Sequence, residues 1–150
     1  MAGKITIALG ADHGGYTLKE GLKEYLLKKG YKVKDFGTYS LRPSDYPLFG
    51  HKAALYVSKK KAQRGIVICK TGFGMAIIAN KLKGIRSAVC DTPMEAKSSR
   101  QHNDCNVLSL AAKRVGLKKA KKIADVFLHT KAEGGRHKRR VRQIVKLEKR

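Results

Sequence analysis

Residues 66–75, with the sequence IVICKTGFGM, join a strand-like apolar run to a cysteine and a glycine-rich turn. Three β-branched residues lead into Cys69, after which Lys70 and two spaced glycines, Gly72 and Gly74, open a helical pattern. Backbone N–H groups at the start of a helix suit an anion or a developing oxyanion. The helix dipole and Lys70 would both favour a thiolate at Cys69. Cys69 is therefore either a reactive thiol or a small apolar residue that ends a buried strand.

The glycine turn matches neither of the two common phosphate-binding motifs. The third glycine of a dinucleotide fingerprint is absent, because the position three beyond Gly74 is Ile77, and no acid ends the next strand before Asp91. The order Gly-x-x-x-x-Gly-Lys-Ser/Thr of a P-loop is absent as well. The turn therefore indicates an anion site of another kind.

Two more polar segments lie at or between strand ends. The sequence GADHGG places Asp12 and His13 in a glycine-flanked turn, where they could accept a hydroxyl and donate to an anion. Asp12 could equally cap the following helix. Residues 98–106, SSRQHNDCN, are dense in polar groups, and His102 among them can give or take a proton near neutral pH. Helix capping explains part of this density, which still favours a site.

A basic segment, EGGRHKRRV, begins the last helical pattern of the chain. Arg136 and Arg140 are four residues apart and share one helical face, where two guanidinium groups could hold one phosphate. Positive charge at the start of a helix opposes the helix dipole, so it calls for an anion. Contact with nucleic acid, or solubility alone, is the alternative explanation.

Apolar runs and helical patterns alternate along the whole chain, and these elements must position the polar segments. Apolar spacing and turn residues predict strands at 4–11, 31–37, 65–69, 86–90 and 106–110, and helices at 16–29, 47–61, 75–82, from 93, at 117–128 and at about 135–149. Strands that alternate with helices imply right-handed crossovers and a parallel sheet. We expect a three-layer α/β/α fold with a five-stranded, mostly parallel, Rossmann-like (flavodoxin-like) sheet. Ligands of such sheets bind beyond the carboxyl ends of the strands.

The composition predicts one domain over residues 1–150 and anionic partners. There are 34 Lys and Arg against 11 Asp and Glu, a formal charge of +23. Residues 113–150 hold 15 Lys or Arg and three acids, which gives a net +12, so about half of the excess lies in the last quarter of the chain. Such a balance favours nucleic acid or phosphorylated metabolites by long-range attraction.

The apolar runs and the cysteines predict a soluble, cytoplasmic protein. No run approaches the length of a membrane span, and the amino terminus lacks the apolar segment of a signal peptide. We therefore expect no membrane partner. Cys69, Cys90 and Cys105 form neither a metal-type spacing nor an even disulfide set, which predicts three reduced thiols.

Taken together, these segments resemble the ribose-5-phosphate isomerase B family, which also includes the galactose-6-phosphate isomerase subunits. The motifs follow in family order and spacing along nearly the whole chain: GADHGG, DYP at 45–47, CKTGFGM, ANK at 79–81, GIR at 84–86, SRQHNDCNVL and EGGRHKRRV. Each motif alone is weak, but the ordered set is highly specific. The resemblance implies an aldose-ketose isomerase that interconverts ribose 5-phosphate and ribulose 5-phosphate through a cis-enediolate, with no metal and no organic cofactor.

The resemblance also implies roles for single residues. Cys69 matches the catalytic base that moves a proton between C1 and C2, and His102 matches the acid-base residue that opens the sugar ring. Thr71 and the glycines of its loop match the donors that stabilise the enediolate oxygen, a role that suits preorganised amides. The expected substrate contacts are Asp12, His13, Tyr46, Lys70, Gly72, Phe73, Gly74, Asn103, Lys113, Arg136 and Arg140.

The family builds its site at a subunit interface. The resemblance therefore implies a homodimer, or a tetramer, with shared active sites and a phosphorylated sugar as substrate, and no specific nucleic-acid partner. Within the same reaction class, the alternative substrate is a six-carbon sugar phosphate, galactose 6-phosphate or allose 6-phosphate. From another class, the alternative is a nucleic-acid-binding protein on the same fold, which would use the excess charge on a phosphate backbone.

Two positions depart from the family pattern. Lys70 stands where the family usually has glycine, and it could clash with substrate or favour the Cys69 thiolate further. Lys113 stands where many relatives have an arginine that contacts ligand, with Arg114 one residue later. Lysine supplies charge without the two-pronged guanidinium fork, so this change bears on phosphate affinity.

Overall fold

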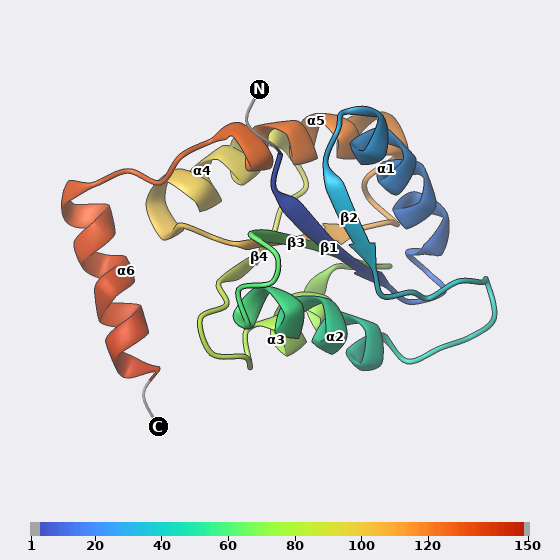
Figure 1. The fold of residues 1–150 in the computed structure, drawn as a ribbon, viewed down its shortest axis with the longest axis horizontal. Coiled ribbons are helices and arrows are strands. Elements are labelled where there is room, and N and C mark those ends of the chain that lie inside the picture. The colour runs from blue at the N-terminus through green and yellow to red at the C-terminus, as the bar shows by residue number, and fades with distance from the viewer. Residues whose placement is uncertain (1–3, 149–150) are drawn as a thin grey trace.

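The computed structural model describes residues 4–148 and contains the predicted alternation of strands and helices (Figure 1). The elements in chain order are β1 (Thr6–Ala11), α1 (Tyr16–Lys28), β2 (Lys32–Asp35), α2 (Tyr46–Ser58), β3 (Arg64–Cys69), α3 (Phe73–Ala79), β4 (Ser87–Val89), α4 (Pro93–Asn103), β5 (Val107–Ala111), α5 (Leu117–His129) and α6 (Gly135–Leu147).

The five strands form one sheet in the order β2-β1-β3-β5-β4, and every neighbouring pair is parallel. The predicted three-layer, Rossmann-like class is confirmed. The flavodoxin order would be 2-1-3-4-5, and the last two strands are exchanged here. This exchange leaves β4 at the edge of the sheet and β3 at its centre.

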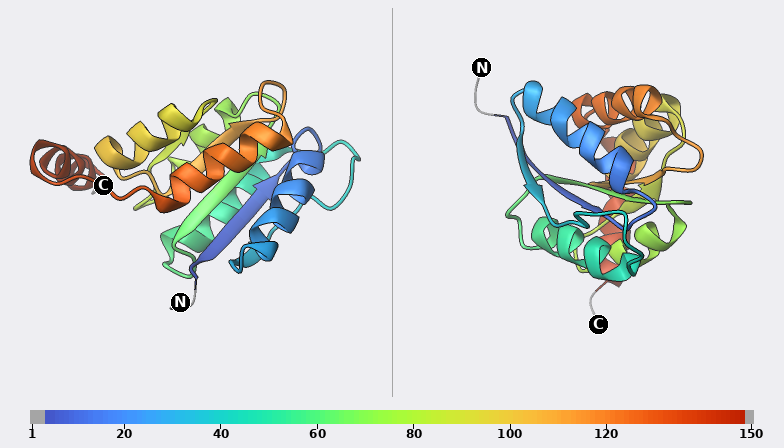
Figure 2. Two further views of the ribbon diagram at one scale, coloured as in Figure 1. Left: turned by 90° about the horizontal axis from the view of Figure 1, so that it is seen from above. Right: turned by 90° about the vertical axis from the view of Figure 1, so that its right-hand side faces the viewer.

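Helices cover both faces of the sheet, as the two views of Figure 2 show. Helices α1, α4 and α5 lie on one face, over a core that includes Leu22, Leu26 and Phe127. Helices α2 and α3 lie on the other face, where Ala53 and Met75 are fully buried. The three inner strands β1, β3 and β5 are almost entirely buried between the two layers, as the centre of a parallel sheet requires.

The last helix, α6, stands apart from the rest of the fold (Figure 1). None of its residues is buried, and Leu147 on its apolar side is 78% exposed. Its end is tied to the body by Glu148, whose Oε1 accepts a hydrogen bond from the Gly84 N–H at 2.8 Å. The helix was expected over 135–149; it runs to Leu147, and residue 149 lies outside the described part.

Three boundaries of α2 and α3 differ from the prediction by two or more residues, and one of them is the end of α3, which lies at Ala79 rather than at residue 82. Helix α2 ends at Ser58 rather than residue 61, and Lys60 takes a positive φ of 60° in the turn that follows. Helix α3 begins at Phe73, two residues earlier than predicted, because Gly72 at φ 78° turns the chain directly into it. At the start of α4, the predicted cap is confirmed: the Thr92 hydroxyl accepts the Glu95 N–H.

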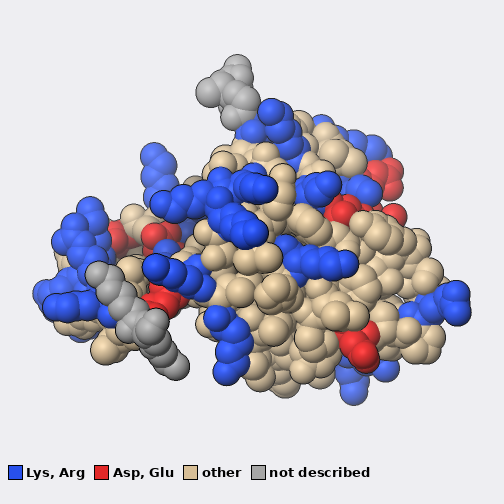
Figure 3. Space-filling view, turned by 60° about the horizontal axis from the view of Figure 1, so that its bottom comes forward, with Lys and Arg blue, Asp and Glu red and all other residues tan. Residues whose placement is uncertain are grey.

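Figure 3 shows many Lys and Arg side chains spread over one face of the molecule, with few acids between them. Over residues 4–148, no helix has the length and hydropathy needed to span a bilayer.

Candidate active site

Cys69 ends the central strand β3 and is 5% exposed. Its Sγ accepts a hydrogen bond from the Gly72 N–H at 3.2 Å. Gly72 can make this contact because it adopts a left-handed conformation, which side chains rarely permit. The turn therefore directs a backbone donor at the sulfur, which stabilises negative charge there.

A pocket of about 380 Å³ opens beside this sulfur, at the carboxyl edge of the sheet. Three segments that are distant in sequence contribute to it: the turn after β1, the first residue of α2 and the turn after β3. Its lining residues are Asp12, His13, Tyr46, Cys69, Lys70, Thr71 and Gly74. All of them are among the site residues predicted from the sequence.

Asp12 and His13 are each fixed by the loops around them. Asp12 Oδ1 accepts the Gly15 N–H at 3.1 Å, which closes the turn before α1; the N-cap residue of α1 is Gly15, so Asp12 does not cap the helix. The backbone N–H of His13 donates to Ser44 Oγ at 3.1 Å, and the backbone N–H of Ser44 donates to the ring nitrogen Nδ1 of His13 at 3.0 Å. Both predicted residues therefore line the pocket with their orientation set by backbone contacts.

Gly74 leaves room for the Tyr46 ring, which lines the pocket. A Cβ added to Gly74 would overlap the Tyr46 ring, so any other residue at this position would displace the tyrosine. Tyr46 is 39% exposed and has room to contact a ligand with its hydroxyl. The second glycine of the turn thus serves side-chain packing.

Lys70 packs along the turn after β1, because its Cγ lies 2.8 Å from the position that a Cβ on Gly14 would occupy. Lys70 is exposed and lines the pocket. Lys113 is exposed and is tied to the turn by its backbone, whose N–H donates to the Lys70 carbonyl at 3.0 Å.

Arg114 is a site residue that the sequence-based prediction did not include. Its guanidinium donates to the Thr71 carbonyl at 2.9 Å, pairs with Asp91 at 2.8 Å and lies over the Phe73 ring. Hydrogen bonding to Asp91 raises the pKa of Arg114, with smaller contributions that include Cys69. The available signal was its position next to Lys113, where the family resemblance predicts an arginine. Phe73 itself is 56% exposed on the rim of the turn.

The other two cysteines are unsuited to acid-base chemistry. Burial raises the pKa of the Cys90 thiol to about 11, and burial likewise raises the pKa of the Cys105 thiol to about 11. At neutral pH both therefore remain protonated thiols, which are poor nucleophiles and bases.

His102 and Asn103 lie at the opposite edge of the sheet from Cys69. Helix α4 starts after the carboxyl end of β4 and runs back, so its last residues lie beside the strand starts. The Asn103 carbonyl accepts the Nε–H of Arg86, the residue that precedes β4. The expectation that the polar segment before β5 lies with the other residues at the strand ends is therefore wrong for a single chain. The six residues of β3 separate the two edges of the sheet by about 17 Å.

His102 forms its own cluster with the start of α6. The rings of His102 and His137 stack with centroids 4.3 Å apart, and His137 Nε2 lies 3.6 Å from Glu133 Oε1. Partial burial, His102 and Arg136 lower the pKa of His137, with Arg140 adding to the effect. Arg136 and Arg140, the predicted phosphate pair, therefore belong to this cluster rather than to the Cys69 pocket.

The same cluster is the one group of side chains in residues 4–148 with a metal-like arrangement. Single ligand atoms of His102, Glu133 and His137 lie within 4.8 Å of one another. Two imidazoles and a carboxylate are ligands for Zn²⁺. The neighbouring Arg136 and Arg140 oppose a cation and favour an anion at this position.

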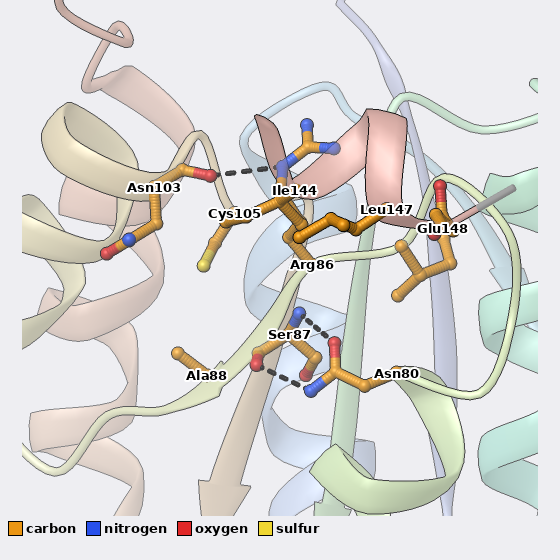
Figure 4. Close-up of a pocket in the computed structure, with 10 residues that line it drawn as sticks. Asn80, Arg86, Ser87, Ala88, Asn103, Cys105, Ile144, Leu147 and Glu148 are labelled. Atoms are coloured by element: carbon orange, nitrogen blue, oxygen red, sulfur yellow. Dashed lines mark hydrogen bonds between the residues drawn. The ribbon is translucent and has the colours of Figure 1, made fainter. Parts of the chain in front are cut away.

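A larger cavity, of about 500 Å³, separates α6 from the body of the molecule (Figure 4). Ile144 and Leu147 face it from α6, and Asn103 and Cys105 line it from the end of α4. The cavity is mostly apolar and contains none of the Cys69 pocket residues. It is therefore a space between elements that apolar side chains could fill.

Comparisons with known proteins show which proteins this chain resembles in sequence and structure. The family model described as Ribose/Galactose Isomerase matches residues 7–144. The chain belongs to this isomerase family. Ribose-5-phosphate isomerase B of Escherichia coli (strain K12) is 46% identical over 144 residues, 96% of this chain and 97% of the relative.

Solved structures of the family superimpose closely. Ribose-5-phosphate isomerase B of Clostridium thermocellum is 49% identical with a TM-score of 0.94, and the match covers 96% of this chain and 97% of that one. The enzyme of Mycoplasma genitalium, solved with bound ribulose-5-phosphate, is 40% identical with a TM-score of 0.92 over 96% of each chain. The family resemblance predicted from the ordered motifs is thereby confirmed.

Proposed function

We propose that the protein is an aldose-ketose isomerase that interconverts ribose 5-phosphate and ribulose 5-phosphate. The observation that carries this proposal is the Cys69 pocket, in which a sulfur with a directed N–H donor faces Asp12, His13 and Thr71. Membership of the isomerase family and the relative that holds ribulose-5-phosphate support the substrate class.

In this proposal Cys69, as a thiolate, removes the proton from C2 of the aldose and returns it to C1. The intermediate is a cis-enediolate, with the hydroxyl proton passing from O2 to O1. Thr71 and the turn amides stabilise the negative oxygen, which lowers the barrier through preorganised donors. The Gly72 N–H, which faces the sulfur in this structure, stabilises the thiolate between turnovers. Asp12 and His13 hold the sugar and the phosphate.

We further propose that the complete site requires two chains. His102 opens the sugar ring and Cys69 moves the proton, so both must come within about 3 Å of one substrate. A single chain places them at opposite edges of its sheet. The exposed apolar side of α6 and the cavity beneath it offer a surface for a second copy. Asn103, Arg136 and Arg140 would then serve the partner's Cys69 pocket, in a homodimer or a tetramer of such dimers.

The three cysteines support a reducing, cytoplasmic location for this enzyme. All of them are free in the structure, and Cys90 and Cys105 are buried without a disulfide. Reduced thiols are typical of cytoplasmic proteins. A catalytic thiol at Cys69 requires the same conditions.

A coupled assay of the purified protein on ribose 5-phosphate tests the proposed reaction. We expect turnover in the wild type and a loss of at least about 1,000-fold in Cys69→Ala, because the proton shuttle is removed. Cys90→Ala is the matched control and should keep wild-type activity. An active Cys69→Ala variant would contradict the assignment of the base.

The same assay with galactose 6-phosphate and allose 6-phosphate tests the substrate. We expect kcat/KM to be highest for ribose 5-phosphate. A higher kcat/KM for either six-carbon sugar would move the protein to the alternative substrate while leaving the reaction class intact.

A further inference from the structure

A second cationic pocket, of about 370 Å³, lies at the amino edge of the sheet. Lys60 from the turn after α2, Arg64 at the start of β3 and Arg86 before β4 supply its positive charges. Asp104, at the end of α4, supplies its one carboxylate. Cys69 ends the strand that Arg64 begins, so about 17 Å of β3 separates this pocket from the catalytic thiol.

The positive charges around this pocket exceed the negative charge available to them. Arg100 Nη1 pairs with Asp104 Oδ1 at 2.8 Å, and Arg86 Nη2 lies 3.4 Å from Asp104 Oδ2. Within residues 4–148, no ion pair joins Lys60 or Arg64 to an acid. Asp104 thus pairs with two guanidinium groups, while the Arg64 guanidinium and the Lys60 ammonium have no acidic partner among residues 4–148, an arrangement that an added anion would balance.

Arg64 carries a buried donor that nothing in the described chain satisfies. Its Nη1 donates to the Gln63 carbonyl at 2.8 Å, whereas its Nε is buried without a hydrogen-bond partner. Burial lowers the pKa of Arg64, and repulsion from Arg100 and Arg86 lowers it further. A buried donor normally has a partner, because leaving it unpaired costs about 1–3 kcal/mol.

Arg86 connects the pocket to the helix that carries His102. Its Nε–H donates to the carbonyls of Asn103 and Asp104, both at 3.0 Å, and the first of these bonds is visible in Figure 4. These bonds occupy one side of the guanidinium and fix it at the edge of the pocket. The group is therefore preorganised, so an anion would not have to immobilise it on binding.

We propose that this pocket binds a phosphoryl oxyanion, held by the Arg64 guanidinium, the Arg86 guanidinium and the Lys60 ammonium. A phosphoryl group offers three oxygens for three cations, and guanidinium forks match its geometry. The ligand is inorganic phosphate or a small phosphate monoester, which present the same group. This inference does not depend on which sugar the enzyme isomerises.

Titration of the ¹⁵N-labelled protein with inorganic phosphate, at ionic strength held constant with NaCl, tests this proposal. The Nε–H resonance of Arg64 reports on the unpaired donor directly, and Arg64→Lys identifies it by its disappearance. We expect a saturable shift of this resonance. The shift should persist in Arg136→Ala/Arg140→Ala, because those arginines belong to the His102 cluster. A parallel titration with glycerol 3-phosphate decides between free phosphate and a monoester by which anion binds more tightly.

Lys60 and Lys61 provide a matched pair of variants. Both are exposed, but only Lys60 lines the pocket. Lys60→Ala should weaken phosphate binding about tenfold, the effect of losing one charge-assisted contact, and Lys61→Ala should change it less than about twofold. An Arg64 resonance that shifts linearly without saturation, or equal weakening by the two lysine variants, would overturn the proposal.

Discussion

His13 and Ser44 are joined by two hydrogen bonds of opposite direction, although 31 residues separate them. The His13 N–H donates to Ser44 Oγ, and the Ser44 N–H donates to His13 Nδ1. An imidazole nitrogen that accepts a hydrogen bond carries no proton, so neutral His13 has its proton on Nε2. The loop that precedes α2 therefore fixes both the orientation and the tautomer of a residue in the proposed phosphate contact.

Ser44→Ala should loosen this arrangement without abolishing it. The backbone bond to Nδ1 remains and the bond to Oγ is lost, a change of about 1 kcal/mol. We expect KM for ribose 5-phosphate to rise about fivefold with kcat nearly unchanged, because Ser44 positions a binding group. Ser40→Ala, in the same loop, is the control, since among residues 4–148 the Ser40 hydroxyl hydrogen-bonds only to the nearby Arg42 N–H. A fall in kcat at constant KM would argue against this function of Ser44.

Lys70 stands where the family resemblance predicts glycine, and it lines the Cys69 pocket. Lys70→Met keeps the aliphatic stem and removes the ammonium. We expect a KM several-fold higher at low salt and a weaker dependence of KM on salt, because a screened attraction to the substrate has been removed. Lys81→Met, at an exposed position outside this pocket, should leave KM and its dependence on salt unchanged. A lower KM in Lys70→Met would show instead that the lysine obstructs substrate.

Asp35 should make the stability of the fold depend on acid pH. Burial acts to raise the pKa of Asp35, but hydrogen bonds from Lys19, the Gly37 amide and Lys23 outweigh it and hold the pKa below the ordinary 3.8. The stabilisation is present above that ordinary value and is lost as pH falls through the lower folded pKa. Lys19 Nζ, fully buried, lies 2.7 Å from Asp35 Oδ2.

Asp35→Asn should therefore destabilise the protein by about 3 kcal/mol at pH 7, because it leaves a buried ammonium short of its counter-charge. Urea unfolding at a series of pH values measures the difference in the free energy of unfolding between variant and wild type. This difference should become smaller as acid protonates Asp35 in the wild type. Glu24→Gln, which removes an exposed pair with Lys28, should cost less than about 0.5 kcal/mol. A difference in the free energy of unfolding that stays constant from neutral to acid pH would contradict the lowered pKa of Asp35.

The geometry around Cys69 could be predicted from the sequence because the residues that determine it are close together in the chain. A β-branched run followed at once by a glycine turn predicts where the strand ends and which backbone amides are exposed. Glycine at position 72 permits the left-handed conformation that the turn adopts. The turn containing Asp12 has the same character. In a parallel sheet such strand ends share one edge, so their proximity is a consequence of the topology.

The position of His102 could not be predicted in the same way. A polar segment between two strands can lie at either edge of the sheet, according to where the helix before it ends. Here α4 occupies nearly the whole segment, which moves His102 to the amino edge. Lys19 is a similar case: a lysine within a helical pattern is expected to be exposed, but tertiary packing buries it, where its Nζ pairs with Asp35 from β2 as well as with the adjacent Glu20.

Subunit complementation tests most directly whether one active site is built from two chains. Cys69→Ala and His102→Ala chains with different tags would be co-expressed, and the mixed dimer purified on both tags. Each parent variant alone should be inactive on ribose 5-phosphate. The mixed dimer holds one site with both residues intact, so we expect about half of the wild-type activity per dimer. A mixed dimer as inactive as its parents, alongside an active wild type, would show that Cys69 and His102 act within the same chain.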